Sequence, residues 1–213
     1  AIDANTMLGS DQLNVEKLIS KDLTISKEDP SPQILIYHTH SKEDFADSTP
    51  GDASQTVVGV GDRLTDILTE QYGYGVLHYT AEFDTIRDDA YAKALPDIEK
   101  LLQENPSIQV VIDVHRDSGV EGVHRAVDIN GRSTATFMLF NGISRTKKTG
   151  EITYLANTNL EDNLAFSFQM QVIAGEYYPG LTRKIYLKGY RYNMHLKSRY
   201  LLIELGDENN TLQ

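Results

Sequence analysis

The chain has 213 residues, no cysteine and a formal net charge of −11. The lack of cysteine excludes disulfides and thiolate-bound metals, and the acidic surplus disfavours nucleic acid and anionic membrane surfaces as partners. No apolar stretch reaches the roughly 18 residues that a transmembrane helix needs.

The first part of the chain divides into a polar lead-in and the start of a domain. Residues 1–33 are mostly polar and predict a loosely ordered segment with a short helix around Val15–Ile19. Residues 34–213 are long enough to form one domain with a single core. A buried strand is expected at Ile34–Tyr37. The loop from 38 to about 58 is long for a compact domain, which indicates a functional role.

Helices and strands alternate in the middle of the chain. The spacing of apolar residues predicts a helix over Gly61–Tyr72, a strand at Val76–Tyr79 and a helix over Ile86–Asn105. Pro96 is expected to kink the second helix or to split it in two. A second central strand is expected at Ile108–Val114.

A hairpin and a long helix precede the last strands. Strand-like residues at Ala126–Ile129 and Thr134–Phe140 flank Asn130-Gly131, which is a strong hairpin signal. The remaining elements are a long helix, an edge strand and a central strand: Asn159–Tyr177, Lys184–Leu187 and Leu201–Leu205. The alternation predicts an α/β fold with a mostly parallel central sheet flanked by helices and an inserted hairpin.

Two histidines and a glutamate stand at the ends of three apolar runs. His40 follows the first strand, His115 ends the second, and Glu204 lies in Leu202-Ile203-Glu204-Leu205-Gly206. In open α/β sheets, ligands bind beyond the carboxyl ends of the strands. We therefore expect these three side chains to meet at one edge of the sheet.

The chemistry of these side chains fits a catalytic zinc site. His40 and Glu43 form an H-x-x-E element whose spacing lets both side chains reach one ion, and His115 supplies a second imidazole. Two histidines and one glutamate, with water in the fourth position, are a known catalytic zinc set. Glu204, inside an apolar strand, suits a general base, and Asp113 suits an acceptor that orients His115. Taken alone, the H-x-x-E element is more often a surface pair and the Asp113–His115 segment is more often structural, whereas a glutamate inside an apolar strand favours a function.

Other polar and aromatic residues are weaker candidates. His38 is expected in the core or supporting a ligand, and His78 as an ordinary strand residue, whereas His124 and His195 could line the cleft or touch substrate. Two arginines, Arg116 and Arg125, could bind a substrate carboxylate. Six late tyrosines offer faces for sugar rings, although most are expected to serve the core or surface: Tyr177, Tyr178, Tyr186, Tyr190, Tyr192 and Tyr200.

Four separated motifs, in order, resemble the stage II sporulation protein P family. They are Ile36-Tyr37-His38-Thr39-His40-Ser41-x-Glu43, then Ile112-Asp113-Val114-His115-Arg116-Asp117-Ser118, then Tyr192-Asn193, and finally Leu202-Ile203-Glu204-Leu205-Gly206 with Glu208-Asn209-Asn210-Thr211. The resemblance runs from about residue 34 to 211, nearly the whole chain.

The resemblance implies a zinc-dependent peptidoglycan hydrolase that acts during engulfment of the forespore. The implied activities are N-acetylmuramoyl-L-alanine amidase and endopeptidase, carried by a catalytic domain over residues 34–213. The implied partners are peptidoglycan, a lytic transglycosylase (stage II sporulation protein D) and a recruiting membrane protein (stage II sporulation protein M). The implied location is extracytoplasmic, between mother cell and forespore, with a membrane anchor preceding residue 1.

The chain is also similar to the broader zinc N-acetylmuramoyl-L-alanine amidases, which implies an amidase-like three-layer sandwich. Their first motif aligns onto Ile34–His40 and makes His40 a ligand rather than His38, and their second histidine matches His115. Their ligand glutamate comes much later after the first histidine, so Glu43 is the less secure ligand here and Asp62 is its rival. An acidic residue is expected near the position of His195, to which no role carries over.

Two other functions remain open from the sequence. A zinc carboxypeptidase or an N-formylglutamate amidohydrolase-like enzyme also uses an H-x-x-E element. A non-catalytic wall-binding module would carry a degenerate metal site or none.

Overall fold

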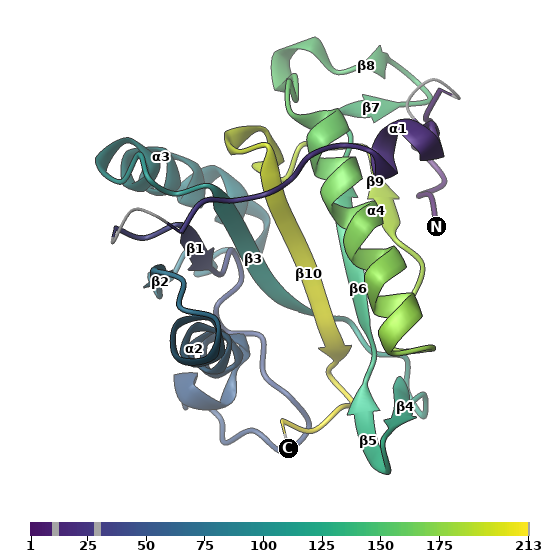
Figure 1. Cartoon of the computed structure of the whole chain (residues 1–213). Coiled ribbons are helices and arrows are strands. Elements are labelled where there is room, and N and C mark those ends of the chain that lie inside the picture. The colour runs from purple at the N-terminus through teal and green to yellow at the C-terminus, as the bar shows by residue number, and fades with distance from the viewer. Residues whose placement is uncertain (10–12, 28–30, 213) are drawn as a thin grey trace.

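A six-stranded sheet forms the centre of the computed structural model, which describes residues 1–9, 13–27 and 31–212 (Figure 1). The strand order is β2-β1-β3-β10-β6-β9. The bounds are β1 Ile34–Tyr37, β2 Val76–Tyr79, β3 Val110–Asp117, β6 Phe137–Gly142, β9 Tyr186–Lys188 and β10 Arg199–Asp207. Neighbouring strands are parallel except β10 and β6. The predicted mostly parallel sheet is confirmed, with β9 as the predicted edge strand.

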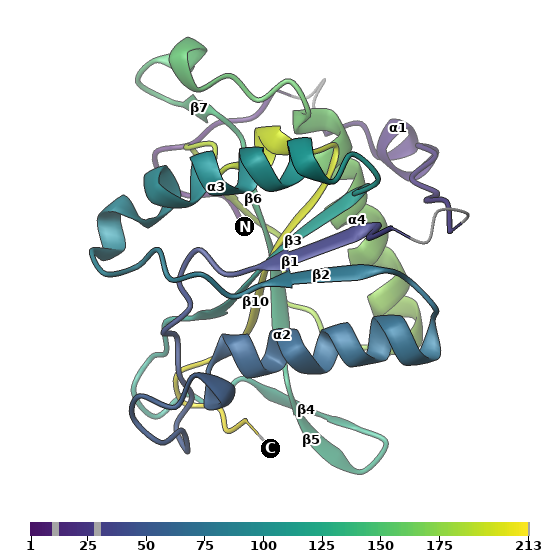
Figure 2. The same ribbon diagram turned by 90° about the vertical axis from the view of Figure 1, so that its left-hand side faces the viewer.

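Helices cover both faces of this sheet, as Figure 2 shows for α3 and α2. Helix α3 (Ala90–Glu104) packs on one face, where Ala94 and Ile98 are fully buried. Helices α2 (Val57–Asp66) and α4 (Leu160–Tyr177) cover the other face. The three-layer sandwich expected from the sequence is therefore confirmed.

The lead-in segment is more firmly packed than its polar composition predicts. Helix α1 (Val15–Ile19) forms where it was expected, and its Leu18 is buried in a cluster with residues of α4. Near the start of the chain, Ile2 bridges to Leu187 of β9, and the Asp3 amide donates to the Leu187 carbonyl at 2.9 Å. The first residues of the lead-in thus pair with the edge strand β9, and α1 packs against α4.

Three element boundaries differ from the sequence prediction. Helix α2 begins at Val57, four residues early, because the Thr56 side chain accepts from the Val58 amide and caps it. Helix α3 continues through Pro96, so the predicted split is wrong; the buried residues on either side hold the helix against the sheet. Strand β3 continues to Asp117, so His115 lies inside the strand.

The predicted hairpin forms, but its second strand is shorter than expected. Strand β4 (Ala126–Ile129) pairs with β5 (Arg132–Ala135) around Asn130 and Gly131, whose φ angles of +55° and +80° fit a type I′ turn. The chain leaves the hairpin at Thr136, whose amide donates to the Arg125 carbonyl, and continues as β6 in the main sheet.

Short elements complete the described chain. They are the 3-10 helices η2 Ala53–Gln55, η4 Arg87–Asp89, η5 Thr153–Leu155 and η6 Met194–Leu196, the π-helical turn η3 Ile67–Gln71, and the small strands β7 Arg145–Thr146 and β8 Gly150–Glu151. Among the described helices, none has the length and apolar character that a membrane span requires.

Candidate metal centre

The three strand-end residues meet in one cavity on the α3 face of the sheet. In β3, Asp113 and His115 point to the same face as Val111, which packs in the α3 core. Strand β10 runs beside β3 with Glu204 directly paired to His115. A cavity of about 450 Å³ is lined by His40, Glu43, His115 and Glu204. The predicted convergence at one edge is therefore confirmed.

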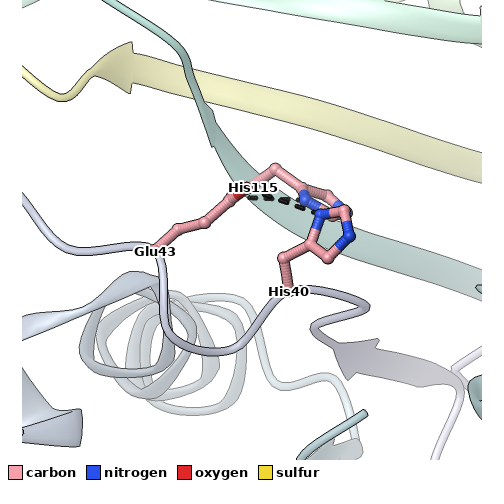
Figure 3. A group of neighbouring side chains, drawn as sticks. All are labelled: His40, Glu43 and His115. Carbon is pink, nitrogen blue, oxygen red and sulfur yellow. Dashed lines mark ion pairs between the residues drawn. The ribbon is translucent and has the colours of Figure 1, made fainter. Parts of the chain in front are cut away.

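His40, Glu43 and His115 form a compact group of possible ligands (Figure 3). One ligand atom from each lies within 4.8 Å of the others. Glu43 is central, because its Oε1 lies 3.5 Å from His40 Nδ1 and its Oε2 lies 3.3 Å from His115 Nδ1. The turn after β1 carries both His40 and Glu43, so the H-x-x-E spacing brings the two side chains together, as predicted.

Glu43 is held as an anion although it is almost completely buried. Burial by itself would raise its pKa, but hydrogen bonds from His115 and His40 and from the Arg116 amide lower the pKa well below its usual range. The Arg116 amide donates to Oε2 at 3.0 Å, and Arg87 donates to Oε1 at 2.8 Å. The carboxylate is thus oriented from two sides.

His115 lies between two carboxylates. Its Nε2 is 2.9 Å from Asp113 Oδ1, opposite the Nδ1 that faces Glu43. Asp113 is fully buried and accepts bonds from the Thr39 amide at 2.9 Å and the Thr39 hydroxyl at 2.6 Å. Burial would lower the pKa of His115, but the two carboxylates outweigh it and raise that pKa well above its usual value. The site therefore favours a positive charge beside this imidazole.

Glu204 is the free carboxylate of the cavity. Burial raises its pKa to about 7, with the charge of Glu43 adding to this effect and that of His115 opposing it. Its Oε2 is buried and has no hydrogen-bond partner among the described residues. A buried acceptor that lacks a protein partner is available for a water or a substrate proton. Two imidazoles, one fixed carboxylate and one free carboxylate fit the donors and the base of a zinc hydrolase.

A model of the family described as stage II sporulation protein P (SpoIIP) matches residues 3–213. The chain belongs to this family. A curated relative, stage II sporulation protein P of Bacillus subtilis (strain 168), is 26% identical over 200 residues, which cover 84% of this chain and 46% of the relative. The chain therefore spans about half the length of that relative. No solved structure matches, so the likeness to zinc amidases stays a prediction.

In this member of the stage II sporulation protein P family, the rival ligand Asp62 lies elsewhere. Asp62 contacts His78, with Oδ1 2.9 Å from Nδ1, and His78 Nε2 lies 2.8 Å from His38 Nε2. His38 donates through Nδ1 to the Val114 carbonyl at 3.0 Å. This second group packs beneath the sheet against α2, and Asp62 is not among the side chains gathered around His115.

Of the other candidates from the sequence, two histidines and Arg125 lie away from the metal cavity, and Arg116 lines it. His124 is exposed and His195 is half-buried, and neither lines the metal cavity. Arg125 lies 3.1 Å from the buried Asp207, so the expectation that it meets substrate is not supported. Arg116 does line the metal cavity, but its Nε donates to the Asp44 carbonyl at 2.7 Å.

Sequence reasoning missed Tyr91, which lines the metal cavity together with Tyr192. The Tyr91 ring lies 5.7 Å from the His40 ring and is stacked on His115 at 6.4 Å. Tyr192, which also lines the cavity, has a φ of +50°, and Asn193 follows with +55°. The Asn193 side chain donates to the Tyr91 carbonyl and fixes this strained pair. The asparagine, which tolerates left-handed backbone, was the signal in the sequence.

The late tyrosines divide between site, core and surface. Tyr186 and Tyr192 line the metal cavity, whereas Tyr200 is fully buried and its hydroxyl meets that of Tyr37. Three are exposed: Tyr177, Tyr178 and Tyr190. The sequence expectation that most of these side chains serve the core or the surface is confirmed.

Proposed function

We propose that this chain is a zinc-dependent peptidoglycan hydrolase. It would cleave the amide between muramic acid and L-alanine, as an N-acetylmuramoyl-L-alanine amidase, and peptide bonds of the stem as an endopeptidase. The observation that carries the proposal is the meeting of His40, Glu43 and His115 within 4.8 Å, with the unpartnered Glu204 in the same cavity.

The donor set favours zinc among the common metals. Imidazole nitrogens suit zinc, and two of them with one carboxylate leave a fourth position open for water and substrate. Magnesium and calcium prefer sites made of oxygen ligands. Asp113 supports the choice, because a carboxylate behind a ligating imidazole orients the ring and raises its basicity.

The reaction would use Glu204 as the proton carrier. A zinc ion held by His40, Glu43 and His115 would lower the pKa of a water and polarise the scissile carbonyl. Glu204, whose pKa is raised by burial, would take the proton of the attacking water and deliver it to the nitrogen of the leaving amine. Tyr91 shields one side of the site and keeps the histidine rings in place.

Family membership supports the biological setting. We propose that the domain acts on the cell wall outside the cytoplasm, between mother cell and forespore during engulfment, and that a membrane anchor precedes it in the full protein. The proposed partners are a lytic transglycosylase, stage II sporulation protein D, and the recruiting membrane protein, stage II sporulation protein M. Pull-down of these two proteins with the purified domain tests this part.

Purified cell wall and metal analysis test the activity. We expect one zinc per chain and release of stem peptides from the wall, identified by mass spectrometry of the new termini. Hydrolysis of small N-acyl amino acids without wall hydrolysis would instead favour an N-formylglutamate amidohydrolase-like or carboxypeptidase activity. Wall binding without zinc and without hydrolysis would favour a binding module.

A further inference from the structure

Lys188 enters the metal cavity from the edge strand β9. Side chains alternate along a strand, so Tyr186 and Lys188 share one face and Leu187 takes the other. Leu187 is buried in the cluster that α4 covers, whereas Tyr186 and Lys188 line the metal cavity. The register of the sheet therefore directs the Lys188 side chain to the face that holds the proposed reaction site.

Three cavities meet at Lys188. Besides the metal cavity of about 450 Å³, Lys188 lines a neighbouring cavity of about 670 Å³ next to Tyr91 and Arg191. It also lines a third of about 780 Å³, next to Lys147 and Lys148. The space leading away from the metal centre past Lys188 is far larger than one amide group needs, so an extended substrate fits it.

The charges along this path suit an anionic ligand. The chain carries a net charge of −11, yet Lys147, Lys148 and Lys188 form no ion pair with any residue that the structure describes. Asp3 and Glu151 also line the third cavity, so it is not uniformly basic. Lys188 shares the lining of the metal cavity with Glu43 and Glu204, and these two carboxylates would repel a substrate carboxylate placed directly on the triad.

We propose that Lys188 binds a carboxylate of the substrate's peptide and directs the peptide from the metal centre toward Lys147 and Lys148. The inference rests on the proposed function. The lactyl carboxyl of muramic acid is consumed in the scissile amide, which leaves the glycan strand uncharged there. Stem peptides keep free carboxylates. The three positively charged lysines would therefore bind the stem peptide rather than the glycan strand.

Two muropeptides that differ only in amidation of their peptide carboxylates test this inference. The wild-type zinc protein is expected to favour the acid form by about tenfold or more in kcat/KM, as for a hydrogen bond to a charged group. Lys188→Met is expected to lose that preference through a higher KM for the acid form, with the amidated form unaffected. Lys188→Arg is expected to restore much of it. Lys184→Met is the matched control, because Lys184 is exposed just before β9 and lies outside the three cavities.

Binding measurements separate this inference from the proposed function. Calorimetric titration of both muropeptides into Glu204→Gln protein, with and without Lys188→Met, is expected to give tighter binding of the acid form only while Lys188 is present. Equal binding of both forms, or an equal loss on both with Lys188→Met, would overturn the role of Lys188 even if the wall is hydrolysed. Preference for the acid form without hydrolysis by the wild type would retain the binding role and overturn the enzyme.

Discussion

Two groups on opposite faces of the sheet contain the same residue types, two histidines and one carboxylate. On the α3 face, His40 and His115 surround Glu43 without a bond between the two imidazoles. On the α2 face, His38 and His78 are joined by their Nε2 atoms at 2.8 Å. The nitrogen and oxygen atoms of the His40, Glu43 and His115 group can all face one ion. In the His38 and His78 group, the two Nε2 atoms are bonded to each other and are not available to an ion. Residue type alone therefore does not make a metal site.

Zinc content is expected to separate the two groups most strongly. His115→Ala, His40→Ala and Glu43→Ala should each abolish stoichiometric zinc binding, because a three-ligand site loses a donor. Asp62→Ala on the opposite face should retain zinc. Elemental analysis after dialysis against zinc provides the measurement. Full zinc in Glu43→Ala together with loss in Asp62→Ala would reassign the third ligand.

Activity is expected to depend on Glu204, the cavity carboxylate whose buried Oε2 has no hydrogen-bond partner among the described residues. Glu204→Gln should keep zinc and lower the rate of wall hydrolysis by about 10²–10⁴-fold, the usual contribution of a general acid–base group. Because burial raises the pKa of this carboxyl, the rate of the wild type should fall at the acidic end of the pH range, where Glu204 takes up a proton and can no longer act as a base. Unchanged hydrolysis in Glu204→Gln would refute the mechanism.

The free energy of unfolding of the metal-free protein should also depend on the protonation of Glu204. The pKa of Glu204 is about 7 in the folded state and near 4.5 in the unfolded state. Between pH 4.5 and pH 7 the folded state therefore keeps a proton that the unfolded state has released. Wild-type stability is therefore lost as pH rises from about 4.5 to 7. The difference in unfolding free energy between Glu204→Gln and wild type should shift by about 2–3 kcal/mol in favour of the variant as the pH is raised from 4 to 8. Urea unfolding at both pH values measures this, and a constant difference would contradict it.

The smallest effect is expected at the contact between α2 and its histidine pair. A Cβ at Gly61 would lie 2.6 Å from His78 Nε2 and 2.8 Å from His38 Nε2, so Gly61→Ala should destabilise the fold by about 1–2 kcal/mol. Zinc content should not change. Gly175→Ala in α4, where a Cβ meets no atom within 4 Å, serves as the control for unfolding measurements. Loss of zinc in Gly61→Ala would mean that the two faces are coupled.

The sequence predicts the fold better than it predicts the limits of the elements. Periodicity identified the buried strands and the helices, because burial of apolar side chains decides both. It misplaced the start of α2, where the capping by Thr56 decides. It also expected Pro96 to kink or split α3, which is not split, because packing outweighs local preference. The end of β6 also escaped prediction, because pairing with β10 and β9 is a long-range effect.

The candidate site was predictable where strand order and spacing determine it. His40, Glu43, His115 and Glu204 follow from strand ends and one short motif. Tyr91, Arg87 and Lys188 did not, because each comes from an element whose neighbours in space are distant in sequence. Asp62 could not be dismissed from the sequence, since only the packing of α2 on β2 pairs it with His78.

The position of β10 has a consequence for how the molecule is made. This strand is the last in the described chain, yet it lies between β3 and β6 in the middle of the sheet. Parallel pairing of β3 with β10 closes a loop of about 80 residues, which is a slow step in folding. Until that step is complete, Glu204 is far from His115 and the core is open. The proposed active site is therefore complete only once the last strand has been inserted between β3 and β6.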